Sequence, residues 1–231
     1  LIFTIGAYQL RPDIDGVLAE QVFTIRDLTS IERVKNYIKD MEPSKAVIVG
    51  GGYIGIEAAE ALHKLKIDVS IIDSRSHILN GDFDADMAAG IQNLLREKGI
   101  KIYLETEVEA FGDKDVTLNN GQKLDYDIAI IATGVKPDLR LSVLSDLEIG
   151  ETGGLIVNEY MQTSDKDIYA AGDDIEVINL ITKKPARMSQ AGLAIKEARV
   201  IAEHLAGISH NFKYALNTAV AQIFGYTAAA V

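Results

Sequence analysis

The chain of 231 residues is 48% hydrophobic and 25% charged, a composition typical of soluble globular proteins with one large domain or two smaller ones. Its formal net charge of −11 argues against a nucleic-acid partner, and no apolar run is long enough to cross a bilayer, so we expect a cytoplasmic protein. The chain has no cysteine, which excludes disulfides, thiolate catalysis and Cys-based metal sites within these residues.

The first half of the sequence predicts a parallel sheet. Residues 1–3 predict a strand that runs into a turn at Gly6, and from Ala46 to Ala132 apolar runs alternate with stretches of helical period. This alternation is typical of βαβ units. We expect strands at residues 45–50, 68–72 and 100–104 and helices at 54–66 and 84–98.

Two details are expected of these helices. The first should bury one apolar stripe on the sheet, made of Ile54, Ala58, Ala61, Leu62 and Leu65. The second should begin with Asp84 as its N-cap and end at Gly99.

The pattern changes after residue 104. Short strands at 108–111, 115–118 and 122–126, joined by polar turns, predict an antiparallel meander before a last strand at 127–134. Further on we expect strands at 154–158 and 167–174 and a helix from about Arg187 to Leu205, ended by Gly207. Residues 217–231 alternate like a strand.

A glycine-rich turn carries the main functional signal. Gly50, Gly52 and Gly55 form a G-x-G-x-x-G pattern directly after one predicted strand and directly before a helix. Gly50 allows the tight turn, Gly52 lets a pyrophosphate approach the backbone, and Gly55 lets the helix pack closely, while the helix N-terminus attracts the phosphates. The alternative is a structural turn in another α/β protein.

Asp73 ends the next strand, where its carboxylate can accept hydrogen bonds from an adenosine ribose. A carboxylate there repels a 2′-phosphate and favours NAD, whereas Arg75 could turn toward such a phosphate and permit NADP, or be a solvated charge. The four histidines read as surface or structural residues. We assign no catalytic residue and no metal ligand.

Four segments carry a family resemblance: residues 47–62 (VIVGGGYIGIEAAEAL), 130–138 (IIATGVKPD), 163–174 (TSDKDIYAAGDD) and 212–231 (FKYALNTAVAQIFGYTAAAV). In this order they resemble the pyridine nucleotide-disulfide oxidoreductases, which are FAD- and NAD(P)H-dependent flavoproteins. The sequence is most similar to the branch that contains NADH oxidase, NADH peroxidase and coenzyme A-disulfide reductase.

The resemblance implies roles for further residues. Tyr53 would lie over the flavin where the nicotinamide enters, Glu57 would point toward the flavin's reactive edge, and Asp173 would contact the ribityl part of FAD. From the residues alone, Tyr53 could fill a groove and Glu57 could be a solvated acid of the first helical turn. Motifs and resemblance together assign these residues to cofactor binding: Gly50, Gly52, Tyr53, Ile54, Gly55, Glu57, Asp73, Arg75, Gly134, Gly172 and Asp173.

The resemblance also implies the domain organisation. Residues 1–25 would end the first segment of an FAD domain, 26–149 would form the NAD(P)-binding domain, 150–210 would return to the FAD domain, and 211–231 would begin a C-terminal dimerisation domain. The fold class we predict is therefore α/β, with a doubly wound Rossmann-like NAD(P) domain, an antiparallel meander and part of a second Rossmann-like domain for FAD.

Two departures and one omission accompany the resemblance. Ile5 stands where the family's first A-T-G turn has Thr, and Lys196 to Arg199 stand where it ends a polar run in Gln-Gly-Arg. The family's N-terminal FAD motif and redox-active Cys would both precede Leu1, and most of the dimerisation domain would follow residue 231. We expect a fragment that is inactive alone.

The activity implied for the full-length protein is hydride transfer from NAD(P)H to FAD. Electrons would then reach a disulfide, a peroxide or oxygen through a Cys outside this chain, in a homodimer. Two alternatives stay open: a non-catalytic NAD(H)-binding module, and a Cys-independent reductase of the ferredoxin or rubredoxin type.

Overall fold

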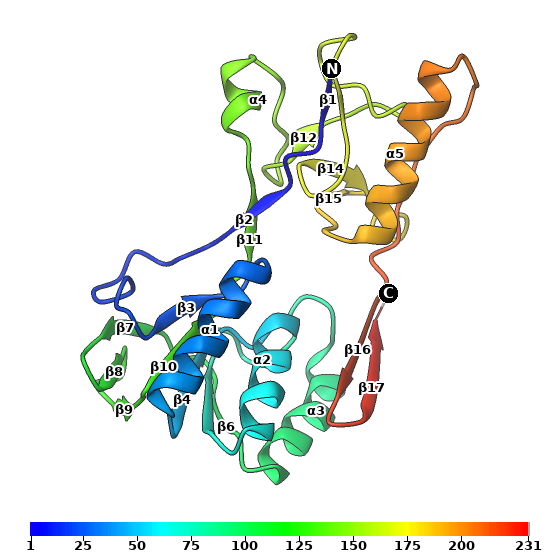
Figure 1. The fold of residues 1–231 in the computed structure, drawn as a ribbon. Coiled ribbons are helices and arrows are strands. Elements are labelled where there is room, and N and C mark those ends of the chain that lie inside the picture. The colour runs from blue at the N-terminus through cyan, green and yellow to red at the C-terminus, as the bar shows by residue number, and fades with distance from the viewer. Residues whose placement is uncertain (231) are drawn as a thin grey trace. The chain divides into compact units, whose positions relative to one another are not determined.

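The chain forms two compact units in the computed structural model, which describes residues 1–230 (Figure 1). Unit 1 consists of residues 1–8 and 135–218, and unit 2 consists of residues 9–134 and 219–230. Val231, the last residue of the predicted dimerisation segment, lies outside the described residues. No helix within residues 1–230 combines the length and the apolar character needed to span a membrane.

Unit 2 is built on a five-stranded parallel sheet in the order β3-β10-β4-β5-β6. Its strands are β3 (Val22–Thr24), β4 (Lys45–Val49), β5 (Asp68–Ile72), β6 (Lys101–Tyr103) and β10 (Ile128–Ile131). Ile48 pairs with Ile71 on one side and with Ile130 on the other, and all three side chains are buried. Val- and Ile-rich runs form these strands because both faces of the sheet are covered. The predicted α/β fold with a parallel sheet is confirmed.

The two faces of this sheet pack against different partners. Ile48 and Ile130 belong to a core shared with the helices α1 (Leu28–Met41), α2 (Tyr53–Lys64) and α3 (Ala85–Glu97). Val47 and Ile131, one position earlier or later, pack instead with the antiparallel sheet of β7 (Val108–Phe111), β8 (Asp115–Leu118) and β9 (Lys123–Asp125). The two-residue period of a strand thus sends neighbouring side chains into two separate cores.

Helix α2 buries a different stripe from the predicted one. Ile54, Ala61 and Leu65 are exposed. The buried residues of α2 are Gly55, Ile56, Ala58, Ala59 and Leu62. A Cβ added at Gly55 would lie 1.9 Å from the carbonyl oxygen of Gly50, so the helix meets the turn closely at this glycine. This close approach fixes which side of α2 faces the sheet, and the apolar spacing alone does not specify it.

The ends of the other helices also add detail. Asp84 is the N-cap residue of α3, as predicted, but its side chain makes no capping hydrogen bond. Helix α1 was not predicted, because only Val34 along it is buried. Its start carries a capping box, in which Ser30 N donates to Asp27 at 2.7 Å and the Ser30 hydroxyl accepts from Asp27 N.

Residues 219–230 form a hairpin in unit 2 rather than a single strand. Strands β16 (Ala219–Ile223) and β17 (Tyr226–Ala230) are antiparallel, and Phe224 and Gly225 turn the chain with positive φ angles. Ile223 is only 1% exposed and belongs to the core between the sheet and the helices α1, α2 and α3, which we call the helix-side core. Phe224 N donates to Glu60 of α2 at 2.9 Å. The hairpin therefore packs against α2.

Unit 1 contains short strands around one long helix. Strand β1 (Ile2–Phe3) pairs in parallel with β13 (Tyr169–Ala170). A second sheet consists, in order, of β12 (Leu155–Ile156), β14 (Ile175–Ile178) and β15 (Pro185–Ala186). Strand β2 (Ala7–Gln9) pairs with β11 (Val135–Pro137). The helices are α4 (Arg140–Leu144) and α5 (Ala191–Leu205). Helix α5 begins after Gln190, later than the predicted Arg187, and residues 185–186 form β15.

Candidate functional site

Unit 2 has a cavity of about 480 Å³ at the carboxyl ends of its parallel strands. Ligands of open α/β sheets bind at this edge, because the loops that follow the strands converge there. The cavity is lined by Pro12, Ile14, Val49, Gly50, Gly52, Ile72, Asp73, Ser74, Arg75, Thr106, Glu107, Val108, Ala132, Thr133 and Gly134. These residues belong mainly to the end of β4, the end of β5 and the segment after β10.

The three glycines of the turn have three different surroundings. Gly50 has φ +112°, and a Cβ there would lie 2.3 Å from the carbonyl oxygen of Ala132. Gly55 touches the backbone of Gly50, as described above. No atom lies within 4 Å of the position that a Cβ would take at Gly52. Because glycine has no side chain, this space stays open. The pyrophosphate of a ligand can therefore approach the protein backbone at Gly52.

The N-terminus of α2 adds hydrogen-bond donors beside this open space. Gly52 is the N-cap and offers no side chain to cap the helix, and the Ile56 N–H donates to the carbonyl of Gly52 at 3.0 Å. The N–H groups of the first turn therefore have no acceptor within the helix. Together with the positive end of the helix dipole, they favour an anion.

Asp73 is anchored between the glycine turn and the loop after β5. Its Oδ2 accepts a hydrogen bond from Gly51 N at 2.6 Å, and its Oδ1 accepts one from Arg75 N at 2.8 Å. Arg75 in turn donates from Nη1 to the carbonyl oxygen of Asn80 at 2.5 Å. The carboxylate is thus held in a defined position on the cavity wall, and the guanidinium of Arg75 is bound to its own loop.

The structure brings together some of the predicted cofactor residues and not others. Gly50, Gly52, Asp73, Arg75 and Gly134 line the cavity. Four further predicted residues, Tyr53, Ile54, Gly55 and Glu57, lie on α2 outside its lining.

Tyr53 has an unusual environment for a tyrosine. Its hydroxyl is buried and has no hydrogen-bond partner among residues 1–230. Burial of the ring, and then the charge of Asp82, raises the pKa of this hydroxyl. Ile54 and Glu57, by contrast, are exposed on the helix surface.

Sequence reasoning missed several residues of the cavity. Gly51 N donates to Asp73, and a Cβ there would lie 2.9 Å from the Ile78 side chain, so this middle glycine of the run leaves little room for a side chain. Thr106 and Glu107 follow β6, the last strand of the βαβ series. The sequence could have indicated these two residues, because they directly follow a predicted parallel strand. The carboxyl ends of parallel strands lie at the same edge of the sheet, where ligands bind.

Unit 1 contains the other predicted cofactor residues, Gly172 and Asp173, in the turn after β13. Gly172 has φ +90°, a conformation that side chains rarely adopt. Asp174, which is 1% exposed, accepts hydrogen bonds from the backbone N–H groups of Ile5, at 2.7 Å, and Gly6. Burial raises the pKa of Asp174. This unpredicted carboxyl connects the turn after β1 with the turn after β13.

A second buried acid supports the same turn. Glu197 of α5 is 1% exposed and accepts a hydrogen bond from Gly172 N at 2.7 Å. Burial, with a smaller contribution from the charge of Asp173, raises the pKa of Glu197 to about 7. Glu197 lies in the run that departs from the family pattern. No cluster of three or more His, Cys, Asp or Glu side chains within residues 1–230 could hold a metal ion.

Comparisons with known proteins agree on one family. Residues 1–202 match the family described as pyridine nucleotide-disulphide oxidoreductase. An NADH oxidase of Methanocaldococcus jannaschii is 33% identical over 226 residues, which are 96% of this chain and 50% of that protein. A coenzyme A disulfide reductase of Staphylococcus haemolyticus is 33% identical over 217 residues, which are 94% of this chain and 49% of that protein.

A solved structure shows the same fold. The NAD-dependent persulfide reductase from A. fulgidus superimposes with a TM-score of 0.95 at 36% identity, covering 99% of this chain and 43% of that one. The chain thus spans about half the length of the curated relatives it matches.

Proposed function

Because the chain belongs to the pyridine nucleotide-disulphide oxidoreductase family, we propose that it forms the NADH-binding part, and one portion of the FAD-binding part, of a flavoprotein oxidoreductase. One observation carries the proposal: the cavity of unit 2 combines open space at Gly52, uncapped N–H groups of α2 and the fixed carboxylate of Asp73. The three features match a pyrophosphate and an adenosine ribose.

We propose NADH as the preferred nucleotide rather than NADPH. Asp73 presents a carboxylate on the cavity wall, and this charge repels a 2′-phosphate. Arg75 is the residue that could accept such a phosphate, but its guanidinium donates to the carbonyl of Asn80. Binding of NADPH would require Arg75 to give up this hydrogen bond while Asp73 stayed beside the phosphate.

For FAD, we assign Gly172 and Asp173 of unit 1. The turn offers a glycine with positive φ and a partly exposed carboxylate at the carboxyl end of a parallel strand, which fits a ribityl hydroxyl. Bound FAD would supply a carrier that accepts hydride and passes electrons on. Glu197 and Asp174 hold the turn in place through backbone N–H groups.

Tyr53 and Glu57 are assigned to the approach of the nicotinamide on the basis of the family resemblance. The resemblance alone carries this assignment, since both residues lie on α2 outside the cavity lining. We propose a disulfide, a peroxide or oxygen as the acceptor, reached through a Cys outside these residues, in a cytoplasmic homodimer. Relatives named NADH oxidase and coenzyme A disulfide reductase support these acceptor classes.

The test is anaerobic reduction of the full-length protein, followed by visible absorbance. We expect NADH to remove the flavin absorbance at a lower concentration than NADPH does, and a long-wavelength thiolate-to-flavin band to appear. NAD⁺ added in the same way serves as the control and should cause no loss of absorbance.

Two results would redirect the proposal. Saturable NADH binding without any flavin reduction would favour a non-catalytic NAD(H)-binding module. Flavin reduction without the long-wavelength band would favour a Cys-independent reductase that delivers electrons to a protein carrier.

A further inference from the structure

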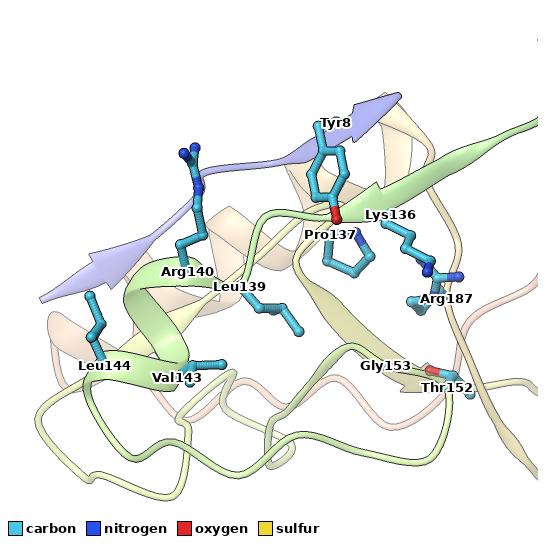
Figure 2. A pocket seen from close by; sticks show the side chains of 10 residues that line it. All are labelled: Tyr8, Lys136, Pro137, Leu139, Arg140, Val143, Leu144, Thr152, Gly153 and Arg187. Carbon is cyan, nitrogen blue, oxygen red and sulfur yellow. The ribbon is translucent and has the colours of Figure 1, made fainter. Parts of the chain in front are cut away.

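Unit 1 contains a second cavity, of about 620 Å³, that shares no lining residue with the nucleotide cavity of unit 2. Its lining consists of Tyr8, Lys136, Pro137, Leu139, Arg140, Val143, Leu144, Thr152, Gly153 and Arg187 (Figure 2). The volume lies within the range of small-molecule sites, roughly 300–1,000 Å³. None of these ten residues is among those assigned above to NADH or FAD.

The cavity is cationic in a protein that is strongly acidic. Three of its lining residues carry a positive charge and none is Asp or Glu, although the whole chain has a net charge of −11. Arg140 is already paired, because its Nε and Nη2 donate to Asp138 at 2.8 and 2.5 Å, and Figure 2 shows its guanidinium directed away from the other labelled side chains. Lys136 and Arg187 form no ion pair or side-chain hydrogen bond within residues 1–230.

A carboxylate that contacts the lining, Glu176, accepts hydrogen bonds from Thr152. Thr152 donates to Glu176 Oε2 from its backbone N–H, at 3.1 Å, and from its hydroxyl, at 2.6 Å. Glu176 is 9% exposed and is not part of the lining. Neither Glu176 nor any other carboxylate of residues 1–230 forms an ion pair with Lys136 or Arg187.

The opposite end of the cavity is apolar. Figure 2 shows Lys136 and Arg187 near Thr152 and Gly153, whereas Val143 and Leu144 lie at the other end on α4. Val143 is 59% exposed and Leu144 is 83% exposed, so both leave large aliphatic surfaces in water. An occupant with an apolar portion would remove this surface from water.

We propose that this cavity binds a small amphipathic organic anion. Its phosphate-type head lies between Lys136 and Arg187, where two cations without counterions offer charge-assisted hydrogen bonds. Its apolar body lies against Val143 and Leu144. Tyr8 adds a hydroxyl to the lining, which can donate to the head group. The site is independent of the proposed redox function.

The probe for this site is 1-naphthyl phosphate, titrated into the purified protein by calorimetry in the presence of saturating NAD⁺. We expect saturable binding, and at least tenfold weaker binding of inorganic phosphate or 1-naphthol alone, because each supplies half of the contacts. The double variant Lys136→Met with Arg187→Met should weaken binding at least tenfold, and Leu144→Ser should weaken it severalfold.

The matched control is Lys184→Met with Arg33→Met, which removes the same two charges from exposed positions outside the cavity. It should bind the probe as the unchanged protein does. An absence of saturable binding to the unchanged protein, an equal loss in the control, or binding of the probe only when NAD⁺ is left out would each overturn the proposal.

Discussion

At the scale of single residues, the fold requires glycine at Gly50 and Gly55, whereas no contact within the chain requires glycine at Gly52. A Cβ at Gly50 or Gly55 would collide with backbone oxygen atoms at 2.3 and 1.9 Å, while a Cβ at Gly52 would meet nothing within 4 Å. One short motif therefore contains positions that control folding and a position that controls access to the cavity.

This difference predicts the effect of Gly52→Ala. The variant should fold, with a free energy of unfolding within about 1 kcal/mol of the unchanged protein, because only the N-cap preference is lost. Its affinity for NADH should fall at least tenfold, because the new methyl group fills the space at the turn. Calorimetric titration and urea unfolding measure the two quantities.

The matched control for that variant is Gly90→Ala in α3, where a Cβ also meets nothing within 4 Å. It should leave the NADH affinity unchanged and stabilise the helix by about 0.5–1 kcal/mol. An unaltered NADH affinity in Gly52→Ala would contradict the assignment of the pyrophosphate to this turn.

Glu197 predicts a pH-dependent stability. Its folded-state pKa is raised from 4.5 to about 7 by burial, so its contribution is fully present below pH 4.5 and is lost as pH rises through about 7. Gln at this position keeps an oxygen that can accept from Gly172 N but cannot ionise. Glu197→Gln should therefore gain stability relative to the unchanged protein as pH rises, by on the order of 3 kcal/mol at pH 8.

Urea unfolding at a series of pH values measures this difference. Asp174→Asn offers a comparison, because burial also raises the pKa of that carboxyl. A stability difference between Glu197→Gln and the unchanged protein that stays constant from pH 4.5 to pH 8 would show that Glu197 does not titrate in this range.

At the scale of elements, α2 connects three parts of unit 2. Its N-terminus begins at the glycine turn, its buried side packs on β4 and β5, and Glu60 accepts a hydrogen bond from Phe224 of the hairpin. The ring of His63 also lies 5.4 Å from that of Phe224. The hairpin of β16 and β17 is therefore joined to α2 by side-chain contacts.

This packing predicts the effect of shortening Ile223. Ile223→Ala should destabilise unit 2 by about 2–5 kcal/mol, because the side chain is 1% exposed in the helix-side core. Val220→Ala on the same strand is the control, since Val220 is 68% exposed and its replacement should cost no more than about 1 kcal/mol. Equal losses in the two variants, measured by urea unfolding, would show that the hairpin does not pack on α2.

At the scale of the whole molecule, the residues proposed for the two cofactors fall in different units. The predicted NADH residues all belong to unit 2, and Gly172 and Asp173 belong to unit 1. Each unit has its own hydrophobic core, because no buried residue of the unit 1 core belongs to the cores of unit 2. A ligand that binds one unit should therefore stabilise the elements of that unit.

Hydrogen exchange with and without NAD⁺ tests this expectation. At about 100 times the dissociation constant, binding stabilises the binding unit by about 2.7 kcal/mol. Backbone amides of β4, β5 and β10 should then exchange more slowly, by up to about 100-fold, while those of β13 and α5 should be unchanged. The same slowing in α5 as in β4 would contradict an independent nucleotide-binding unit.

The sequence by itself determined the parallel sheet, the antiparallel meander, the glycine turn and the position of Asp73 at a strand end. These features depend on local periodicity and on neighbours along the chain, which a single sequence displays directly. The strand β5 ends at Ile72 and the helix α2 begins at Tyr53, close to the predicted positions.

Only the tertiary structure decided the features that join distant segments. The contact of Asp174 with Ile5, the support of Gly172 by Glu197, and the packing of Ile223 on the helix-side core all involve residues far apart in sequence. Such contacts leave no period or spacing in the chain. The cationic cavity belongs to the same class, because Lys136 and Arg187 line one cavity only once the chain has folded.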